Sequence, residues 1–199
     1  MKQTHKLFRC LVDAALDDQR RWSSVGELAW EAGVGESWAY KALAHPIAIG
    51  SVTKLSGGGI SVTDPERILM ILSAKRSLAG ARRTTLDATQ SLISSSDAYA
   101  IGGTRAASRH LGGSNTIADH AEAIVYVPDS FDLQDLPAGE GALVLLADER
   151  SMRDWSDGFT SRAQTFADLF AQPGWQASEF RRALWRAWFE IDDWSRKDA

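Results

Sequence analysis

The sequence predicts an α+β protein in which an N-terminal winged helix-turn-helix is followed by a mixed α/β domain. Residues 24–62 read as two short helices, a glycine-containing turn and a two-stranded ribbon. From about residue 84 onward, short apolar runs typical of strands alternate with segments of helical spacing. We place the boundary near residues 78–83, which gives a DNA-binding domain over 1–80 and a second domain over 81–199.

Composition narrows the function classes. With 199 residues, 44% of them hydrophobic, the chain can bury one or two cores. Cys10 is the only cysteine, so a disulfide framework or a cysteine metal site is excluded, and we expect neither a metal nor a cofactor. No apolar run approaches the roughly 20 residues of a membrane span, and the N-terminus lacks the apolar stretch of a secretory signal. We therefore expect a cytoplasmic protein without membrane contacts.

Charge is distributed unevenly along the chain. Residues 1–83 contain 12 Lys and Arg against 8 Asp and Glu, a net of +4, whereas the remainder has 10 against 18, a net of −8. A basic segment joined to an acidic one is typical of a DNA-binding domain fused to a second domain. The alternative is that both segments simply carry a solvated surface.

The helical elements of the first domain follow in order. Apolar residues recur at helical spacing over 6–17, which predicts a supporting helix. Ser24 and Glu27 have the spacing of a capping box that begins the next helix, and Gly33 can end it in the left-handed conformation. A further helix is predicted over 35–44, and we expect Pro46 to stop it.

The helix over 35–44 has two different faces. Ala39 and Leu43 fall together on one side, which we expect to face the core. The opposite side is polar, basic and aromatic, as a recognition helix requires. This outward set consists of Ser37, Lys41 and His45, flanked by Trp38 and Tyr40.

A wing is predicted after this helix. Strands over 47–55 and 60–62 flank a tip that contains Gly57, Gly58 and Gly59, and such a tip can approach a phosphate backbone closely. Lys54 lies at its base. Arg20 and Arg21, in the polar loop before the helix pair, either contact phosphate or are solvated. Double-stranded DNA is thus the expected partner, although helix pairs followed by hairpins also occur in protein-interaction modules.

Thr63-Asp64-Pro65-Glu66 is a second capping-box start, with Pro65 inside the first turn, and we expect the helix that follows it to close the first domain. In the second domain we expect helices and strands without an internal repeat. The helices are predicted over 84–93, 104–111, 161–170 and 176–193, and the strands over 98–101, 122–127 and 142–147.

Four segments together resemble AbiEi-type antitoxins of type IV toxin–antitoxin systems. They are the winged N-terminus, AYAIGGTRAASRHLGG, EAIVYVPDS, and RAQTFADLFAQPGWQASEFRRAL with its Asp168-Leu169 pair. The resemblance implies a winged-helix repressor of its own operon, an antitoxin whose toxin-like protein partner is encoded nearby. It assigns no DNA-contact residue, so the contact residues named above rest on helix phase.

The segment AIGGTRAASRHLGG also resembles the opening of a nucleotidyltransferase core, in which two carboxylates on the next strand bind Mg²⁺. Those carboxylates must be two residues apart because a strand alternates its faces. Here the candidates, Asp119 and Glu122, are three apart. We therefore expect no catalytic residues and no enzyme, and the glycines then belong to a degenerate core or to a simple packing turn. An active nucleotidyltransferase is the alternative function. His110 and His120 lack metal-ligand spacing.

The C-terminal segment is rich in tryptophan. Leu184, Trp188 and Ile191 recur at helical spacing, with further aromatic residues outside that stripe. Tryptophan is enriched both in cores and at interfaces. Core packing, a homodimer contact and a docking surface for a protein partner all remain open.

Overall fold

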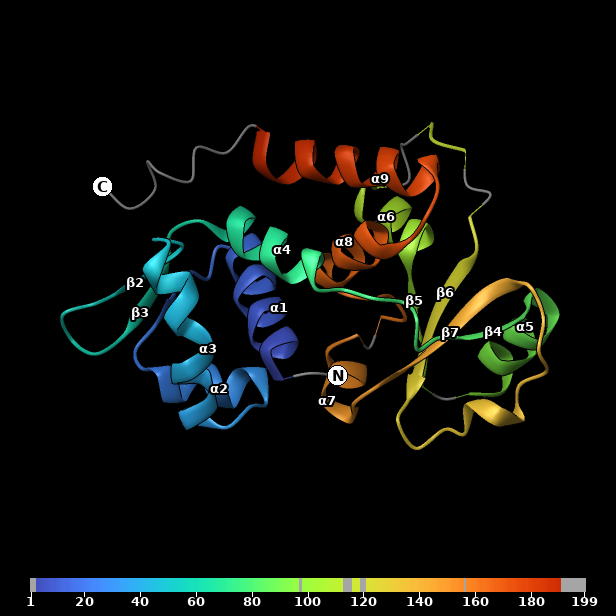
Figure 1. The fold of residues 1–199 in the computed structure, drawn as a ribbon, viewed down its shortest axis with the longest axis horizontal. Coiled ribbons are helices and arrows are strands. Elements are labelled where there is room, and N and C mark those ends of the chain that lie inside the picture. The colour runs from blue at the N-terminus through green and yellow to red at the C-terminus, as the bar shows by residue number, and fades with distance from the viewer. Residues whose placement is uncertain (1–2, 97, 113–115, 119–120, 156, 191–199) are drawn as a thin grey trace. The chain divides into compact units, whose positions relative to one another are not determined.

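The protein is α+β: N-terminal helices with a small three-stranded antiparallel sheet are followed by a mixed four-stranded sheet with helices. The computed structural model describes residues 3–96, 98–112, 116–118, 121–155 and 157–190 (Figure 1). These residues pack as two compact units. The first unit contains the chain up to Lys75 and again from Trp185, and the second unit contains Arg76–Leu184.

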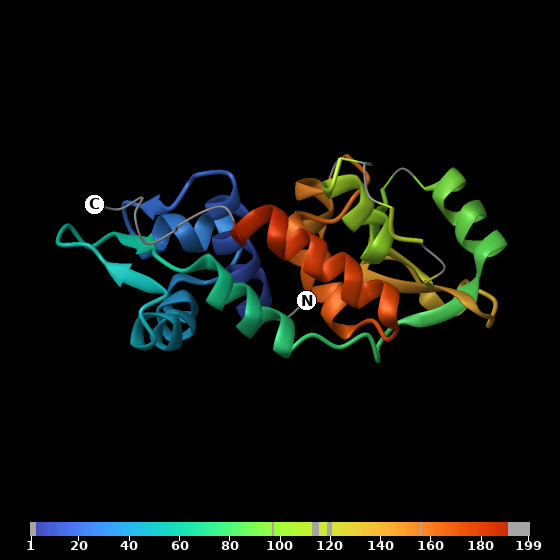
Figure 2. The ribbon, with the colours of Figure 1, turned by 90° about the horizontal axis from the view of Figure 1, so that it is seen from above.

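Among the described residues, the first unit includes the π-helical turn η2 (Arg186–Glu190) and, up to Lys75, four helices and three short strands. They are α1 (Gln3–Leu16), β1 (Arg21–Trp22), α2 (Val25–Ala32), α3 (Glu36–Ala48), β2 (Val52–Lys54), β3 (Ile60–Val62) and α4 (Pro65–Ala74). The sheet has the order β1-β3-β2, and all its pairs are antiparallel. In both views the β2–β3 hairpin projects away from the helices of this unit (Figures 1 and 2).

The predicted ends of α2 are confirmed, and α4 begins within the predicted segment 63–66, but its N-cap is Asp64 and not Thr63. The Ser24 hydroxyl accepts a hydrogen bond from the Glu27 N–H at 3.0 Å, and Gly33 ends α2 with φ 64°. Asp64 caps α4 in the same way by accepting from the Arg67 N–H at 2.9 Å. These side chains satisfy N–H groups that have no partner within the helix.

The return contact of the capping box differs from expectation. The Glu27 carboxylate accepts from the N–H of Ser23 at 2.7 Å and from its hydroxyl at 2.6 Å. These two hydrogen bonds lower the pKa of Glu27. The box is therefore extended by one residue on its N-terminal side.

The predicted end of α3 was wrong. The helix continues through Pro46 to Ala48, and the strand expected from residue 47 begins only at Val52. Proline removes one helical hydrogen bond. Here its ring is buried, and the His45 carbonyl still accepts from the Ile49 N–H at 3.1 Å. Burial in the core and the remaining hydrogen bonds therefore maintain the last turn.

The second unit contains a four-stranded sheet of order β4-β7-β6-β5. Strands β6 and β7 are parallel, and the other two pairs are antiparallel. Its strands are β4 (Arg82–Thr85), β5 (Ala100–Gly102), β6 (Ala123–Pro128) and β7 (Gly141–Ala147). Its helices are α5 (Leu86–Ser95), α6 (Gly103–His110), η1 (Leu133–Asp135), α7 (Glu149–Asp154), α8 (Arg162–Ala171) and most of α9 (Trp175–Trp185), which a π-helical turn, η2 (Arg186–Glu190), follows.

Alternation along β6 separates two cores. Ile124 and Tyr126 pack with Trp155 of α7 on the face that α6 and α8 also cover. Val127 packs on the other face with Leu92 of α5. Both faces of this sheet are therefore covered, which accounts for the nearly continuous apolar sequences of β6 and β7.

Three elements of the second unit were not predicted: β4, η1 and α7. The expected helix over 84–93 is preceded by β4, in which Thr84 and Thr85 pair with Ala142 and Gly141. The Thr85 hydroxyl then caps α5 by accepting from the Ala88 N–H at 3.2 Å. Helix α7 is too short to show a helical period in the sequence. Among the described residues, no helix has the length and apolar character needed to cross a membrane.

Candidate nucleic-acid interface

Helix α3 presents the side chains that its sequence predicted on each face. Ala39 and Leu43 are fully buried in the first unit. Ser37, Tyr40, Lys41 and His45 are exposed, and Trp38 is half-buried at the margin of this face. Tyr40 has 54% of its surface accessible, which is unusual for a large aromatic side chain. Donors, a cation and an aromatic ring therefore share one accessible helix face.

The three glycines of the hairpin tip differ in burial. Gly57 and Gly58 are exposed, nothing lies within 4 Å of a Cβ built on either, and Gly58 has φ +86°. Gly59 is buried, and a Cβ there would lie 2.4 Å from the Trp22 carbonyl oxygen. Gly59 is thus required by the close approach of the β1 backbone, while Gly57 and Gly58 form the accessible tip. Lys54 is exposed at the end of β2.

Arg20 and Arg21 lie in different environments. Arg20 is only 8% exposed, so its side chain is neither solvated nor placed on the surface. This burial differs from both alternatives that the sequence left open for Arg20. Arg21 is exposed and pairs with Ser61 across β1 and β3. Only Arg21 of these two is accessible to an anionic ligand.

The unit boundary changes the electrostatic argument. It falls between Lys75 and Arg76, so Arg76, Arg82 and Arg83 belong to the second unit. Residues 1–75 then hold nine Lys and Arg against eight Asp and Glu, a net charge of +1. The net of +4 counted over residues 1–83 therefore does not describe the first unit. Any attraction for phosphate must come from the local positions of Lys41, Lys54 and their neighbours.

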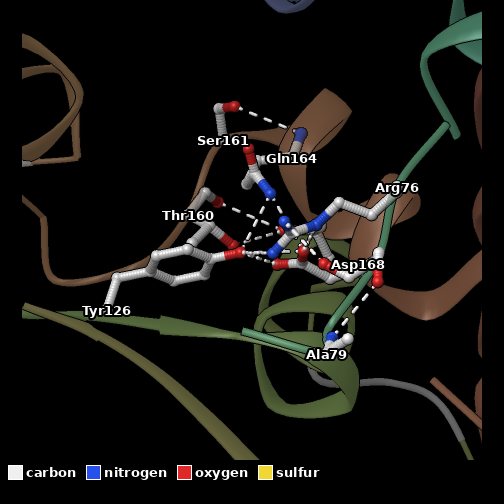
Figure 3. A network of polar contacts seen from close by, with 9 residues as sticks. Arg76, Ala79, Tyr126, Thr160, Ser161, Gln164 and Asp168 are labelled. Carbon is white, nitrogen blue, oxygen red and sulfur yellow. Dashed lines mark hydrogen bonds and ion pairs between the residues drawn. The ribbon is translucent and has the colours of Figure 1, made fainter. Parts of the chain in front are cut away.

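A buried polar network occupies the second unit (Figure 3). Arg76 donates from Nε to Oδ1 of Asp168 at 2.7 Å, and it also donates to the Tyr126 hydroxyl. That hydroxyl lies 2.8 and 2.9 Å from the two Asp168 carboxylate oxygens. Gln164, one helical turn before Asp168, donates to Oδ1 at 2.9 Å. Segments far apart in the sequence thus meet at one carboxylate.

Burial dominates the titration of this network. It raises the pKa of Asp168, and the three donors Arg76, Tyr126 and Gln164 oppose the rise. Burial likewise raises the pKa of Tyr126, with a further contribution from Asp168. For Arg76, burial lowers the pKa but the carboxylate more than compensates, so the guanidinium stays charged. Because protein donors already surround the carboxylate, this arrangement fixes elements in place rather than offering a reactive group.

The Asp168-Leu169 pair was the only sequence signal for this network. Gln164 could have been found from its position one turn earlier on the same helix face. Arg76 and Tyr126 carried no local signal, because their roles depend on contacts across 92 and 42 residues of sequence.

The Gly102-Gly103 turn is filled by protein groups. A Cβ on Gly102 would lie 3.1 Å from Oδ2 of Asp168, and one on Gly103 would lie 3.0 Å from Oε1 of Gln172. Gly103 also has φ +61°. The glycines therefore allow the start of α6 to pack closely on α8 and β6.

Of the two carboxylates considered for Mg²⁺, the structure describes only Glu122. Glu122 pairs with Arg83 at 3.3 Å, while Asp119 and His120 lie outside the described residues. His110 is hydrogen-bonded through Nε2 to the Thr160 carbonyl oxygen at 2.9 Å. Within the part of the chain that the structure describes, no three His, Cys, Asp or Glu residues are grouped so as to hold a metal ion.

The aromatic C-terminal segment has both buried and exposed members. Phe180, Leu184 and Phe189 are buried, whereas Trp175 is 59% exposed. Within the first unit, Trp185 donates from Nε1 to Glu66 Oε1 of α4 at 2.7 Å. Ile191 and Trp194 lie outside the described residues. Core packing thus accounts for part of the segment and leaves Trp175 accessible.

The chain was also compared with known proteins. Searches against protein-family models, curated proteins and solved structures found no match.

Proposed function

We propose that this protein is a DNA-binding transcription regulator whose helix α3 enters the major groove. One observation carries the proposal: α3 exposes Ser37, Tyr40, Lys41 and His45, and the β2–β3 hairpin that follows it in the chain projects from the unit. The first unit has, in chain order, a helix, a strand, two helices and a hairpin, and its sheet order is β1-β3-β2. Winged helix-turn-helix domains have this arrangement. That argument is an analogy of fold, and the function rests on the side chains themselves.

The chemistry of this face suits duplex DNA. Hydroxyl, imidazole and ammonium groups supply hydrogen bonds to base edges, and Lys41 and Lys54 supply charge for phosphates. The exposed Gly57 and Gly58 have no side chain to hold their backbone away from a phosphate. In this proposal α3 reads the sequence, and the tip of the hairpin positions the protein on the adjacent backbone.

The resemblance to AbiEi-type antitoxins supports a more specific form of the proposal. In that form the protein is an antitoxin-like repressor that binds DNA upstream of its own gene. Its second unit would contact a toxin-like protein or a second copy of the chain. A two-fold operator would suit such a dimer, because half-site spacing follows protein symmetry.

A second candidate function is a protein-interaction module that does not bind DNA. The near-neutral charge of residues 1–75 favours it, as does Trp30, which is 77% exposed on α2. Interfaces between proteins are enriched in such aromatic residues. The two functions differ in their response to salt, because phosphate contacts release counterions on binding.

Fluorescence anisotropy of the full chain distinguishes them. The protein is titrated against the duplex upstream of its own gene and against a scrambled duplex, each at two salt concentrations. A regulator binds the upstream duplex more tightly and loses affinity as salt rises. Absence of binding to both duplexes at low salt would reject the DNA-binding proposal and favour the interaction module.

A further inference from the structure

A pocket of about 550 Å³ lies in the second unit, beside the buried network. Pockets of roughly 300–1,000 Å³ are typical of small-molecule sites. One wall is the irregular segment between Arg76 and β4, and the opposite wall includes the start of β7 and the residues around the end of α8. Neither the proposed DNA interface nor the buried network accounts for this pocket.

About half of the pocket wall is apolar, and this half is built mainly from small side chains. Leu78, Ala79 and Ala81 line it from the irregular segment, and Leu143 and Pro173 line it from the other side. Arg76, the cation at the inner end of this segment, is already engaged with Asp168 and Tyr126. The apolar half of the wall therefore suits an apolar group.

Arg83 supplies an accessible charge in the same pocket. Its side chain is 60% exposed, and Nη2 lies 3.3 Å from the Glu122 carboxylate. In the part of the chain that the structure describes, Glu122 is the only side-chain partner of this guanidinium, which leaves Nε and Nη1 to bind a ligand. A guanidinium binds carboxylates in a planar, bidentate geometry.

Glu122 restricts the charge of that ligand. Its backbone is held by Gln172, which donates from Nε2 to the Glu122 carbonyl oxygen at 2.9 Å. The Glu122 carboxylate consequently stays near Arg83 and repels groups with more than one negative charge. A phosphate ester would therefore bind less well than a monoanion.

We propose that this pocket binds a small monocarboxylic acid with an apolar chain or ring, whose carboxylate pairs with Arg83 while its apolar part contacts Leu78, Ala81 and Leu143. This pocket does not involve the proposed DNA interface. An experiment can therefore reject either proposal without rejecting the other.

The test uses the full chain and the fluorescent probe 1-anilinonaphthalene-8-sulfonate, an aromatic monoanion. We expect saturable binding that octanoate displaces and that the uncharged octanamide displaces much less. Arg83→Gln should weaken probe binding about tenfold, the usual scale for losing a charge-assisted hydrogen bond. Arg153→Gln is the matched control, because Arg153 is exposed on α7 and does not line the pocket.

Ala79→Trp tests the location of the site without removing a charge. Ala79 is exposed at the pocket edge, so a tryptophan there can fill the pocket without entering the core. We expect this variant to retain its circular dichroism spectrum and to lose probe binding. Probe affinity that is unchanged in both Ala79→Trp and Arg83→Gln would overturn the site. Equal displacement by octanoate and octanamide would overturn the carboxylate assignment.

Discussion

Arg76 and Asp168 form a buried ion pair, with Nε and Oδ1 2.7 Å apart, across 92 residues of sequence. Asp168 is fully buried in α8, and the Arg76 side chain is 13% exposed at the start of the second unit. The pair attaches the segment that precedes β4 to the helix that covers the sheet. A buried pair of this kind specifies an arrangement more than it adds stability.

Asp168→Ala should therefore destabilise the second unit strongly. Removing the carboxylate leaves the Arg76 cation and the Tyr126 hydroxyl without their partner, at a cost of about 3–5 kcal/mol in unfolding free energy. Urea denaturation followed by circular dichroism measures this change. Glu140→Ala, an exposed carboxylate in the same unit, is the control and should change little. The double variant Arg76→Met/Asp168→Leu should recover part of the lost stability, because it leaves no unpaired charge. If the double variant is no more stable than Asp168→Ala, the unpaired Arg76 cation does not explain the loss.

Gly59→Ala and Gly57→Ala should differ although the residues are two positions apart. A Cβ at Gly59 would lie 2.4 Å from the backbone oxygen of Trp22, so β1 or the hairpin must shift. We expect a loss of about 1–3 kcal/mol, as for other overpacked sites. Gly57→Ala meets no atom within 4 Å and should be neutral or slightly stabilising. Thermal unfolding of both variants decides the matter, and equal melting temperatures would show that the backbone contact at Gly59 is unimportant.

Lys41→Ala should weaken binding to the upstream duplex and reduce its salt dependence. If Lys41 contacts one phosphate, the slope of log affinity against log salt should fall by about one. Lys75→Ala removes the same charge from an exposed position outside α3 and should have a smaller effect. Anisotropy titrations over a range of salt concentrations measure both variants. An unchanged slope for Lys41→Ala would remove Lys41 from the phosphate contacts.

Acid should destabilise the second unit through His110. Burial lowers the pKa of this imidazole, and Arg162 and Arg109 lower it further, while the hydrogen bond to Thr160 acts in the opposite direction. The unfolded chain, with a histidine pKa of about 6.5, binds the proton at higher pH than the folded chain does. The stability from neutral His110 is therefore complete above that value and is lost as the pH falls through the folded pKa.

His110→Gln tests this pH dependence, because an amide can still donate to the Thr160 carbonyl and does not titrate. Unfolding free energies of the wild type and the variant are measured at intervals below neutrality, and the wild type should lose more stability than the variant as the pH falls. Parallel curves for the two proteins would exclude His110 as the titrating group.

The sequence predicted the structure best at positions where one residue satisfies a nearby backbone group or adopts a special backbone conformation. Ser24 begins α2 as predicted, α4 begins within one residue of its predicted start, and Gly33 ends α2 in the left-handed conformation. The burial of Ala39 and Leu43 also followed from helix phase alone. These features depend on neighbours within one or two turns, so the sequence contains nearly all the necessary information.

Tertiary contacts changed the predictions at other positions. Pro46 would end an isolated helix, but its burial keeps α3 continuous to Ala48. Arg20 reads as a surface residue and is buried. Thr84 reads as the start of a helix and instead pairs with Ala142. In each case a partner distant in sequence outweighs a weak local preference.

The sequence by itself determined the α+β class, most of the helices, the two faces of α3 and the glycine-rich hairpin. Only the tertiary structure decided that the first unit breaks off at Lys75 and resumes at Trp185, that residues 1–75 are nearly neutral, and that Arg76, Tyr126, Gln164 and Asp168 meet. The physical reason is the sequence distance over which each interaction acts. Capping and periodicity act over a few residues, whereas the burial of a charge and the choice of its partner depend on how distant segments pack together.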